Sequence, residues 1–547
     1  MGAASSDIRQ VDRWFDYLVL GAGSAGCAVA GRLARAGHKV ALVEAGSAFA
    51  RPWSRMPLGN ALQVPKQPGL NNWKYETAPE PGLNYRRGYQ PRGRVLGGSS
   101  AINGMIYLRG RPDDYDRWLS MGNRGWGWND VRPVFESFER PDGDINSVDA
   151  DDNFGVAVSI CRSHSGADEI FFSGAKERGL RRLNQREIPN CEAVFPFRFS
   201  QYGSGQFAGR RCSSADAFLH SLPREQRPHV FCNTLVDYLA IAQGKATHVM
   251  CRRGRNTLRL GARQEIILCA GAFGSPAILQ RSGVGPAKLL KKCGVEIVRD
   301  MSEVGQNLQD HLQCGLHYSC RDNRFMGLTP GGVLDLAKAI WTWRKMGRGW
   351  GSSTFTQSGG YLKSDENRAL PDLQCHFFSG IVRDHGNRLH AARGYSAHVY
   401  VVDPDSRGSV EIASSNVRTP PRITPNYLSH LNDLRRTRVG LKRLQHILDA
   451  PAFRALDPAA IADIRGFNDP EIDTFIRSNA DTAYHPVGTC RMGCDTNSVV
   501  DNNLRLRGIE GVRIADASIM PRIVSSNTNA ASIMIGIQAA EFILKRG

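Results

Sequence analysis

The segment from Phe15 to Gly46, FDYLVLGAGSAGCAVAGRLARAGHKVALVEAG, narrows the possible folds more than any other part of the chain. A short apolar run leads to three glycines, Gly21, Gly23 and Gly26. Small residues with helical periodicity follow, and a second apolar run ends at Glu44. This order of strand, glycine-rich turn, helix and strand predicts a β-α-β unit in a parallel sheet.

The glycines and Glu44 also predict what this unit binds. Glycines allow a tight turn and let the backbone approach a pyrophosphate, whose charge the N-terminus of the next helix stabilises. Glu44 ends the second strand, where a carboxylate can accept hydrogen bonds from ribose hydroxyls. An ordinary tight turn does not need all of these elements together. We therefore predict a dinucleotide site that prefers FAD or NAD to NADP.

A second glycine-rich segment lies in PRGRVLGGSSAINGMIYLRG, from Pro91 to Gly110. Its GGSSAING core is long enough to surround a further part of an extended cofactor with backbone N–H groups. The apolar residues from Met105 to Leu108 follow directly and should bury it, whereas an ordinary loop would stay at the surface.

The composition is that of a globular protein. The chain has 547 residues, of which 41% are apolar and 22% charged, and this length suits two or three domains, or one large domain with an insertion. No apolar run approaches the roughly eighteen residues of a membrane span, and charges precede the first apolar run, unlike in a secretory signal. The 13 cysteines are scattered singly. We expect a cytoplasmic protein without disulfides.

The net charge of +18 is spread along the whole chain, so it does not indicate a nucleic-acid site. One segment, Leu336 to Trp350, combines basic residues with three tryptophans. It could be a helix that lies on a membrane surface, or a partly exposed helix whose tryptophans cover the core; the second interpretation is favoured. The sequence predicts no particular oligomeric state.

Several motifs, in chain order, resemble those of the glucose-methanol-choline (GMC) oxidoreductases, flavoenzymes that use FAD. The Pro91 to Trp118 segment is similar to their first signature, and GAFGSPAILQRSGVGP (Gly271 to Pro286) to their second. Further matches are VGQNLQDH (304–311), YHPVGTCRMG (484–493), ADASIMP (515–521) and NTNAASIMIG (527–536). INGMIYLRG resembles most the bacterial branch of choline dehydrogenases and aliphatic alcohol dehydrogenases.

The resemblance implies how FAD is held. The first three glycines would hold the diphosphate, Glu44 the adenosine ribose and Val236 the adenine. The second glycine-rich segment would lie along the flavin, Ala272 near the adenosine half, and Asp516 and Ala517 beside the ribityl chain and diphosphate. The expected cofactor residues are Gly21, Gly23, Ser24, Ala25, Gly26, Glu44, Gly97, Gly98, Ser100, Asn103, Gly104, Val236, Ala272, Asp516, Ala517 and Ala530. Some relatives attach FAD through a histidine two residues after the paired serines; Ile102 stands there, which predicts non-covalent FAD.

His485 has three possible roles: a metal ligand with Cys490 and Cys494, a buried structural histidine, or a catalytic base. No carboxylate or second histidine lies close to it in sequence, so we expect no metal site. The resemblance places His485 on the family's catalytic histidine, and Asn529 on a second position that is histidine or asparagine among members. An imidazole of ordinary pKa near 6.5 can accept a hydroxyl proton at neutral pH. Asn529 would donate its amide N–H to the substrate oxygen.

Between about residues 311 and 474 the glycine motifs stop, and alternating segments such as LQCHFFSG, SAHVYVVDP and GSVEIASS predict antiparallel strands. Helices such as the one expected from Leu431 to Ala450 would lie on one side of this sheet. The expected fold is a Rossmann-like α/β domain that binds FAD, with an inserted α+β domain whose antiparallel sheet binds substrate. FAD-binding parts are expected at 1–155, 205–310 and 475–547, and substrate-binding parts at 156–204 and 311–474. His376, Phe377 and Phe378 are candidates for lining the substrate pocket.

The predicted function is oxidation of a small alcohol to an aldehyde or ketone. A proton would leave the hydroxyl, a hydride would pass to flavin N5, and a quinone-type acceptor would take the electrons. Four alternatives stay open: an alcohol oxidase that uses O2, a non-redox flavoenzyme of lyase or photodecarboxylase type, an NAD-dependent Rossmann dehydrogenase, and a catalytically silent flavin-binding or interaction protein. The expected location is the cytoplasm, and peripheral contact with the inner membrane is left open.

Overall fold

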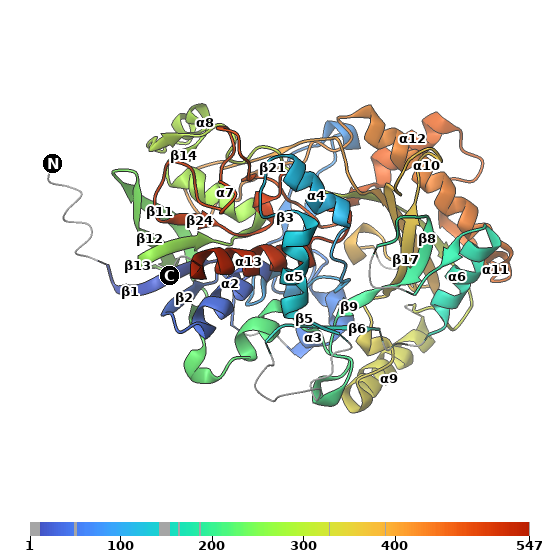
Figure 1. Cartoon of the computed structure of the whole chain (residues 1–547). Coiled ribbons are helices and arrows are strands. Elements are labelled where there is room, and N and C mark those ends of the chain that lie inside the picture. The colour runs from blue at the N-terminus through green and yellow to red at the C-terminus, as the bar shows by residue number, and fades with distance from the viewer. Residues whose placement is uncertain are drawn as a thin grey trace.

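The computed structural model describes residues 11–48, 52–141, 154–161, 163, 165–184, 188–327, 329–388 and 390–545. Two sheets lie at opposite ends of the molecule (Figure 1). One contains the N-terminal strands, and the other is covered on its outer side by a group of helices. The predicted combination of a Rossmann-like domain with an antiparallel-sheet domain is confirmed.

The first sheet contains the predicted β-α-β unit. Strand β1 (Arg13–Leu20) lies between β2 (Val40–Val43) and β13 (Asn256–Leu268) and is parallel to both. The sheet continues on one side to β10 (His229–Phe231). On the other side it continues to the antiparallel strands β12 (Lys245–Arg253) and β11 (Leu235–Ala242), while β24 (Val512–Ile514) also pairs with β13. Leu18, Val19 and Leu20 are fully buried, because helices and loops cover both faces of a parallel sheet.

Helix α2 (Ser24–Arg35) connects β1 to β2, and α13 (Asn529–Leu544) packs along it (Figure 1). The small residues predicted from the sequence allow this close approach. A Cβ atom at Gly536 would lie only 2.5 Å from the Ala25 carbonyl oxygen. The first and last parts of the chain therefore meet beside the first glycine-rich turn.

The second sheet has eight strands, in the order β22 (Ala459–Ala462), β16 (Leu312–Ser319), β19 (Gly394–Val401), β18 (Leu373–Phe378), β17 (Thr356–Leu362), β8 (Ala193–Pro196) and β7 (Arg181–Arg182), with β23 (Asp481–Thr482) pairing with β16. Its outer face packs against α6 (Ala167–Glu177), α10 (Leu431–Leu448), α11 (Pro451–Arg454) and α12 (Asp469–Asn479). Residues of that face, such as Leu316, Phe377 and Val399, are fully buried. Because side chains alternate along a strand, their neighbours point to the other face.

Two details differ from the sequence-based expectation. The segment GSVEIASS was expected in the substrate sheet, but β20 (Ser409–Glu411) pairs only with β21 (Arg422–Thr424) in a separate ribbon. β23 belongs to the second sheet although it lies beyond residue 474, where that part was expected to end. The exact domain boundaries stay a prediction.

The remaining elements connect and cover the two sheets: β3 (Tyr75–Glu76), β4 (Tyr89–Gln90), β5 (Glu139–Pro141), β6 (Val156–Ile160), β9 (Arg198–Ser200), β14 (Val284–Gly285), β15 (Arg299–Asp300), α3 (Pro52–Arg55), α4 (Pro112–Ser120), α5 (Trp128–Phe138), α7 (Gly271–Arg281), α8 (Ala287–Lys292) and α9 (Pro330–Met346). Within these described ranges, no helix is long and apolar enough to cross a membrane.

Candidate active site

A cavity of ≈ 1090 Å³ is lined by residues from both sheets. It reaches from Glu44, at the carboxyl end of β2, and Val236, at the start of β11, to His485 and the inner face of the second sheet. Such a cavity can hold a ligand much larger than a simple alcohol.

Most of the expected cofactor residues line this cavity: Gly21, Gly23, Ser24, Ala25, Glu44, Gly98, Asn103, Gly104, Val236, Ala272, Asp516 and Ala517. Four others, Gly26, Gly97, Ser100 and Ala530, lie behind its wall. A Cβ atom at Gly26 would lie 1.9 Å from the Gly21 carbonyl oxygen, so this glycine lets helix α2 meet the turn. The Ser100 hydroxyl donates to the Gly97 carbonyl (2.6 Å) and accepts from Ser214 N (2.9 Å). These residues therefore support the wall of the cavity and do not line it.

The end of the cavity next to Gly23 and Glu44, here called its inner end, suits a dinucleotide. Helix α2 begins after Gly23 without a side-chain cap, and a Cβ atom at Gly23 would meet no described atom within 4 Å. The Glu44 carboxylate accepts from Ala22 N (3.1 Å) and Gly46 N (2.7 Å), and burial raises its pKa to about 7. A helix N-terminus with free N–H groups beside open space suits a pyrophosphate, and the held carboxylate suits a ribose.

Asp516 lies beside this end of the cavity, and its carboxylate is held from three directions. It accepts from Gly271 N (2.8 Å), Ser275 Oγ (2.5 Å) and Ser518 N (2.8 Å). Burial raises the pKa of this carboxyl group above its ordinary value. Asp516 therefore joins the N-terminal part of α7 to the segment that leads to the C-terminal helix.

His485 is fixed through its backbone. The His485 N–H donates to Asp310 Oδ1 at 2.8 Å. The other oxygen of Asp310 accepts from the hydroxyls of Thr482 (2.6 Å) and Tyr427 (2.5 Å). Tyr484 has a φ of 73°, an unfavourable left-handed conformation that turns the chain at this point. The imidazole is consequently held at one place in the cavity wall.

A second histidine, His311, determines which nitrogen of His485 carries the proton. His311 Nε2 lies 2.8 Å from the Val402 carbonyl, which can only accept, so His311 carries its proton on Nε2. Its Nδ1 is then an acceptor for His485 Nδ1, 2.9 Å away. His485 Nε2 is left with a lone pair directed into the cavity. This is the tautomer that a base requires.

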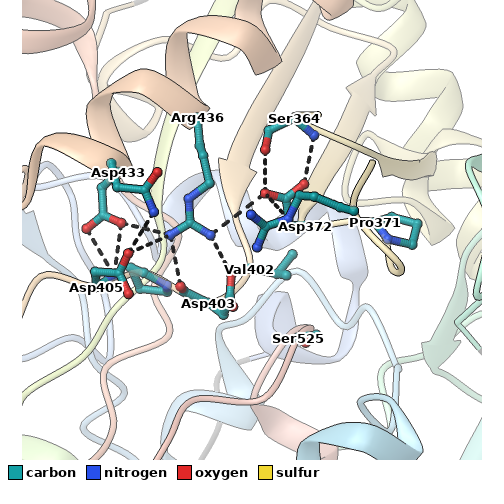
Figure 2. A network of polar contacts seen from close by, with 12 residues as sticks. Ser364, Pro371, Asp372, Val402, Asp403, Asp405, Asp433, Arg436 and Ser525 are labelled. Carbon is teal, nitrogen blue, oxygen red and sulfur yellow. Dashed lines mark hydrogen bonds and ion pairs between the residues drawn. The ribbon is translucent and has the colours of Figure 1, made fainter. Parts of the chain in front are cut away.

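The turn that carries Val402 is itself held by an ionic network (Figure 2). The buried Arg436 of α10 binds Asp403 (2.7 Å), Asp433 (3.0 Å) and Asp405 (3.3 Å). Val402 N donates to the Asp372 carbonyl at 3.0 Å. A buried charge is stable only when it is paired, so this network fixes the turn after β19 and, with it, the acceptor of His311.

Burial lowers the pKa of His485 well below 6.5, and nearby His311, His376 and Arg92 lower it further. The pKa of His311 is lowered to about 4, also by burial. Both rings are therefore neutral at neutral pH, which agrees with the hydrogen-bond pattern. A neutral imidazole with a free lone pair can accept a proton from a ligand.

The neighbour of His485 is Asn527 and not Asn529. Asn527 Nδ2 lies 3.1 Å from His485 Nε2, and Asn527 Oδ1 is buried without a partner among the described residues. Asn529 begins α13, and its Oδ1 accepts from Ser24 Oγ at 2.7 Å. The expected pairing of His485 with Asn529 is thus corrected. The NTN motif contains two asparagines two residues apart. The turn before α13 determines which of them contacts His485.

A metal site is not seen in this region. The described residues contain no group of three or more His, Cys, Asp and Glu side chains placed to hold an ion. Cys490 is buried, and its pKa is raised well above the ordinary value by burial; Cys494 is exposed.

Of the three pocket candidates on β18, His376 and Phe378 line the cavity. Phe377 points to the outer face, where its ring stacks on Phe171 at 4.9 Å, so this candidate was wrong. Strand alternation predicts such a division, but the sequence does not say which of the two sets faces inward.

Family models described as GMC oxidoreductase match residues 15–313 and 404–536. An alcohol dehydrogenase [acceptor] of Pseudomonas putida is 36% identical, over 97% of this chain and 96% of its own. An oxygen-dependent choline dehydrogenase of Cronobacter sakazakii is also 36% identical, over 97% and 95%. Among solved structures, pyridoxine 4-oxidase from Mesorbium loti has a TM-score of 0.82 and 28% identity, over 96% of this chain and 98% of its own. An FAD-dependent oxidoreductase from Chaetomium thermophilum has a TM-score of 0.85 and 25% identity, over 97% and 99%.

Proposed function

Because the chain belongs to the GMC oxidoreductase family, we propose that His485 and Asn527 are the catalytic pair of its alcohol-oxidising reaction. The protein is an FAD-dependent oxidoreductase that acts on alcohols, as its relatives do. The observation that carries the assignment is the chain of hydrogen bonds from Val402 through His311, which leaves the His485 Nε2 lone pair directed into the cavity.

The FAD site combines the residues that line the inner end of the cavity. The N-terminus of α2 would hold the diphosphate, Glu44 the adenosine ribose, and Val236 the adenine. Ile102, which also lines the cavity, has no nucleophilic atom, and this supports non-covalent binding. Asn529 lies at the N-terminus of α13 beside Ser24, and we assign it to the wall around the cofactor. When bound, FAD supplies the acceptor for the hydride that leaves the carbinol carbon.

His485 and Asn527 have different roles at the substrate oxygen. The substrate hydroxyl takes the place of the Asn527 amide at His485 Nε2 and donates its hydrogen there. His485 Nε2 then receives the proton, and the Nδ1–H remains bound to His311. Asn527 has two amide hydrogens and cannot accept a proton, so it donates to the alkoxide oxygen as negative charge develops. Both groups act in a buried site, where such interactions are stronger than in water.

The proposed reaction is tested by mixing the purified holoenzyme with a panel of primary alcohols under anaerobic conditions. We expect the absorbance of oxidised flavin near its visible maximum to bleach with at least one alcohol, because the hydride reduces the cofactor. Flavin that stays oxidised with every alcohol would refute alcohol oxidation and favour a non-redox reaction.

Helix α9 supports a contact between the protein and a membrane. Leu334 and Trp341 have 74% and 57% of their surface exposed, and Lys338 and Lys345 lie on the same helical face. Trp343, by contrast, is partly buried, and its Nε1 donates to the Gly209 carbonyl. Trp341 therefore fits the interpretation as a membrane-surface helix, and Trp343 fits the interpretation as a helix whose tryptophans cover the core. Exposed apolar and basic residues on one helix face are typical of peripheral membrane helices.

The position of α9 connects this surface to the reaction. Leu336 and Ile340 line the cavity, so the helix lies at its wall. We therefore assign a quinone-type acceptor, which is dissolved in the membrane, to this enzyme. The names of similar proteins include both an acceptor-dependent dehydrogenase and oxidases, so relatives alone do not decide the acceptor.

This assignment predicts that anionic phospholipid vesicles loaded with a quinone re-oxidise the reduced enzyme faster than dissolved O2 does. Replacing both Leu334 and Trp341 with Asp should weaken vesicle binding by about tenfold or more, because each removes an apolar side chain from the contact. Leu431→Asp is a matched control, since Leu431 is 76% exposed and lies outside the cavity wall. Equal vesicle binding by the double variant and the control, or faster re-oxidation by O2, would contradict the proposal.

A further inference from the structure

Three buried histidines, His317, His376 and His398, line the cavity although proton transfer at His485 does not need them. They lie on the adjacent strands β16, β18 and β19 of the second sheet. On each strand their sequence neighbours point to the apolar outer face, so the alternation of the sheet directs all three rings inward. A wall of imidazoles is unusual for a pocket that binds only a hydrocarbon chain.

The three rings form a row that leads away from the base. The ring of Tyr400 lies between the base and this row, 6.0 Å from the ring of His485 and 5.4 Å from that of His376. His376 and His398 are partners across the β18–β19 ladder. The rings of His398 and His317 lie 5.4 Å apart, edge to face. A substrate whose reacting carbon lies at His485 can therefore extend along these side chains.

Hydrogen bonds fix the proton position of His376 and engage one nitrogen of His317. The Tyr400 hydroxyl donates to Gln374 Oε1 (2.5 Å), so the Gln374 amide hydrogens face His376 Nε2 (3.0 Å). His376 then carries its proton on Nδ1. Ser396 Oγ accepts from Val382 N (2.9 Å) and lies 2.9 Å from His317 Nδ1. When the serine hydroxyl donates to this nitrogen, His317 has its N–H on Nε2. The second nitrogen of each ring makes no hydrogen bond to these partners.

His398 is the least satisfied of the three. Neither ring nitrogen has a hydrogen-bond partner of good geometry in the described part of the chain. The Val382 backbone, which acts on this ring, can engage one nitrogen at most. The ring occupies the space beside Gly315, where a Cβ atom would lie 2.6 Å from Nε2. A buried, unpaired polar atom is unfavourable, so its retention beside a cavity indicates a missing ligand atom.

The row is uncharged. Burial lowers the pKa of His376 to about 3 and that of His398 to about 4, and it lowers the pKa of His317 well below 6.5. Two carboxylates elsewhere on the cavity wall have partners: Asp481 binds His385 at 2.9 Å, and Asp384 lies 3.8 Å from Arg388. Neutral donors and acceptors pair with neutral oxygen atoms. Arg383, which also lines the cavity, lowers the pKa of His317 through its positive charge, so this end of the cavity offers no counter-charge to a cationic ligand.

We propose that His317, His376 and His398 bind a second, neutral oxygen of the substrate. The substrate is then an alcohol that carries at least one further hydroxyl or carbonyl group, such as a diol or polyol, and not a plain alkanol or a cationic alcohol. This inference rests on the proposed function, because it concerns the part of the substrate that extends beyond the reacting carbon.

The test compares terminal diols of three to eight carbons with 1-alkanols of the same length, and includes choline as a cationic probe. For at least one chain length, we expect kcat/KM for the diol to exceed that for the alkanol by about tenfold or more, because the alkanol leaves buried nitrogens unpaired. Choline should be a poorer substrate than that diol. Oxidation of alkanols with no preference for any diol would overturn the inference but leave the proposed function intact. No oxidation of any alcohol would instead refute the proposed function.

Variants test whether the three histidines cause the preference for diols over 1-alkanols. In His398→Phe, the ratio of diol to alkanol kcat/KM should fall to near one. His376→Gln and His398→Gln keep a neutral donor and should retain part of the ratio, and they provide the test if the phenylalanine variant does not fold. Val399→Ala is the matched control, since Val399 lies on the same strand and points to the outer face. A ratio that is unchanged in all three histidine variants would contradict the proposal.

Discussion

In His485→Gln, kcat/KM for alcohol oxidation is expected to fall by about 10²- to 10⁴-fold, the usual contribution of a general base. Glutamine has no nitrogen that can accept a proton, so the alcohol would have to lose its proton to water in a buried site. The loss should appear in the anaerobic rate of flavin reduction, while the protein keeps its bound FAD. A variant that retains more than a tenth of wild-type activity would contradict the role of His485 as base.

The pH dependence separates proton transfer from a structural effect. Only neutral His485 can accept a proton, and its pKa is lowered well below 6.5, mainly by burial and further by the nearby His311, His376 and Arg92. In the wild type, kcat/KM should therefore stay constant from pH 8 to 6.5 and decline only at lower pH, as His485 becomes protonated. In His485→Gln this acidic limb should disappear.

The two asparagines provide a matched pair for the same assignment. Asn527→Ala removes the donor beside His485 Nε2 and should lower kcat by about 10²-fold, as for the loss of one oxyanion donor. Asn529→Ala removes a hydrogen bond to Ser24 and should affect kcat much less. The opposite order of effects would restore Asn529 as the catalytic partner.

The second large effect concerns two neighbouring glycines with different surroundings. Gly23→Ala is expected to weaken FAD binding by about 10- to 100-fold, because the added methyl group points into open space where the cofactor's diphosphate would lie. The φ of Gly23 is −82°, which alanine adopts without strain. The free energy of unfolding of the apoprotein should therefore change by no more than about 1 kcal/mol.

Gly26→Ala should have the reverse pattern. Its methyl group would lie 1.9 Å from the Gly21 carbonyl oxygen, so the apoprotein itself must distort. We expect a loss of several kcal/mol of stability or no soluble protein. Thermal or denaturant unfolding of both apoproteins, together with titration of each with FAD, checks the pair. Unchanged FAD affinity in Gly23→Ala would contradict the diphosphate position.

Several features could be predicted because they depend on neighbouring residues. The β-α-β unit follows from the apolar periodicity and the glycines around Gly21, and helix α10 follows from the pattern at 431–450. The motifs that resemble the GMC family run along nearly the whole chain, and the comparisons confirm the family and the FAD cofactor. Strand alternation could be seen in LQCHFFSG, but not which of its faces is turned inward.

The sequence by itself determined the fold class and predicted the dinucleotide site, since short-range periodicity and backbone freedom carry that information. The catalytic role of His485 was predicted from the family resemblance and stays a prediction. Only the tertiary structure decided that Asn527 and not Asn529 meets His485, and that His311, 174 residues away in sequence, selects its tautomer. It also brought three histidines from separate strands into one row. Hydrogen bonds of this kind depend on angles and distances between segments far apart in the chain, and these are set only when the two sheets pack around the shared cavity.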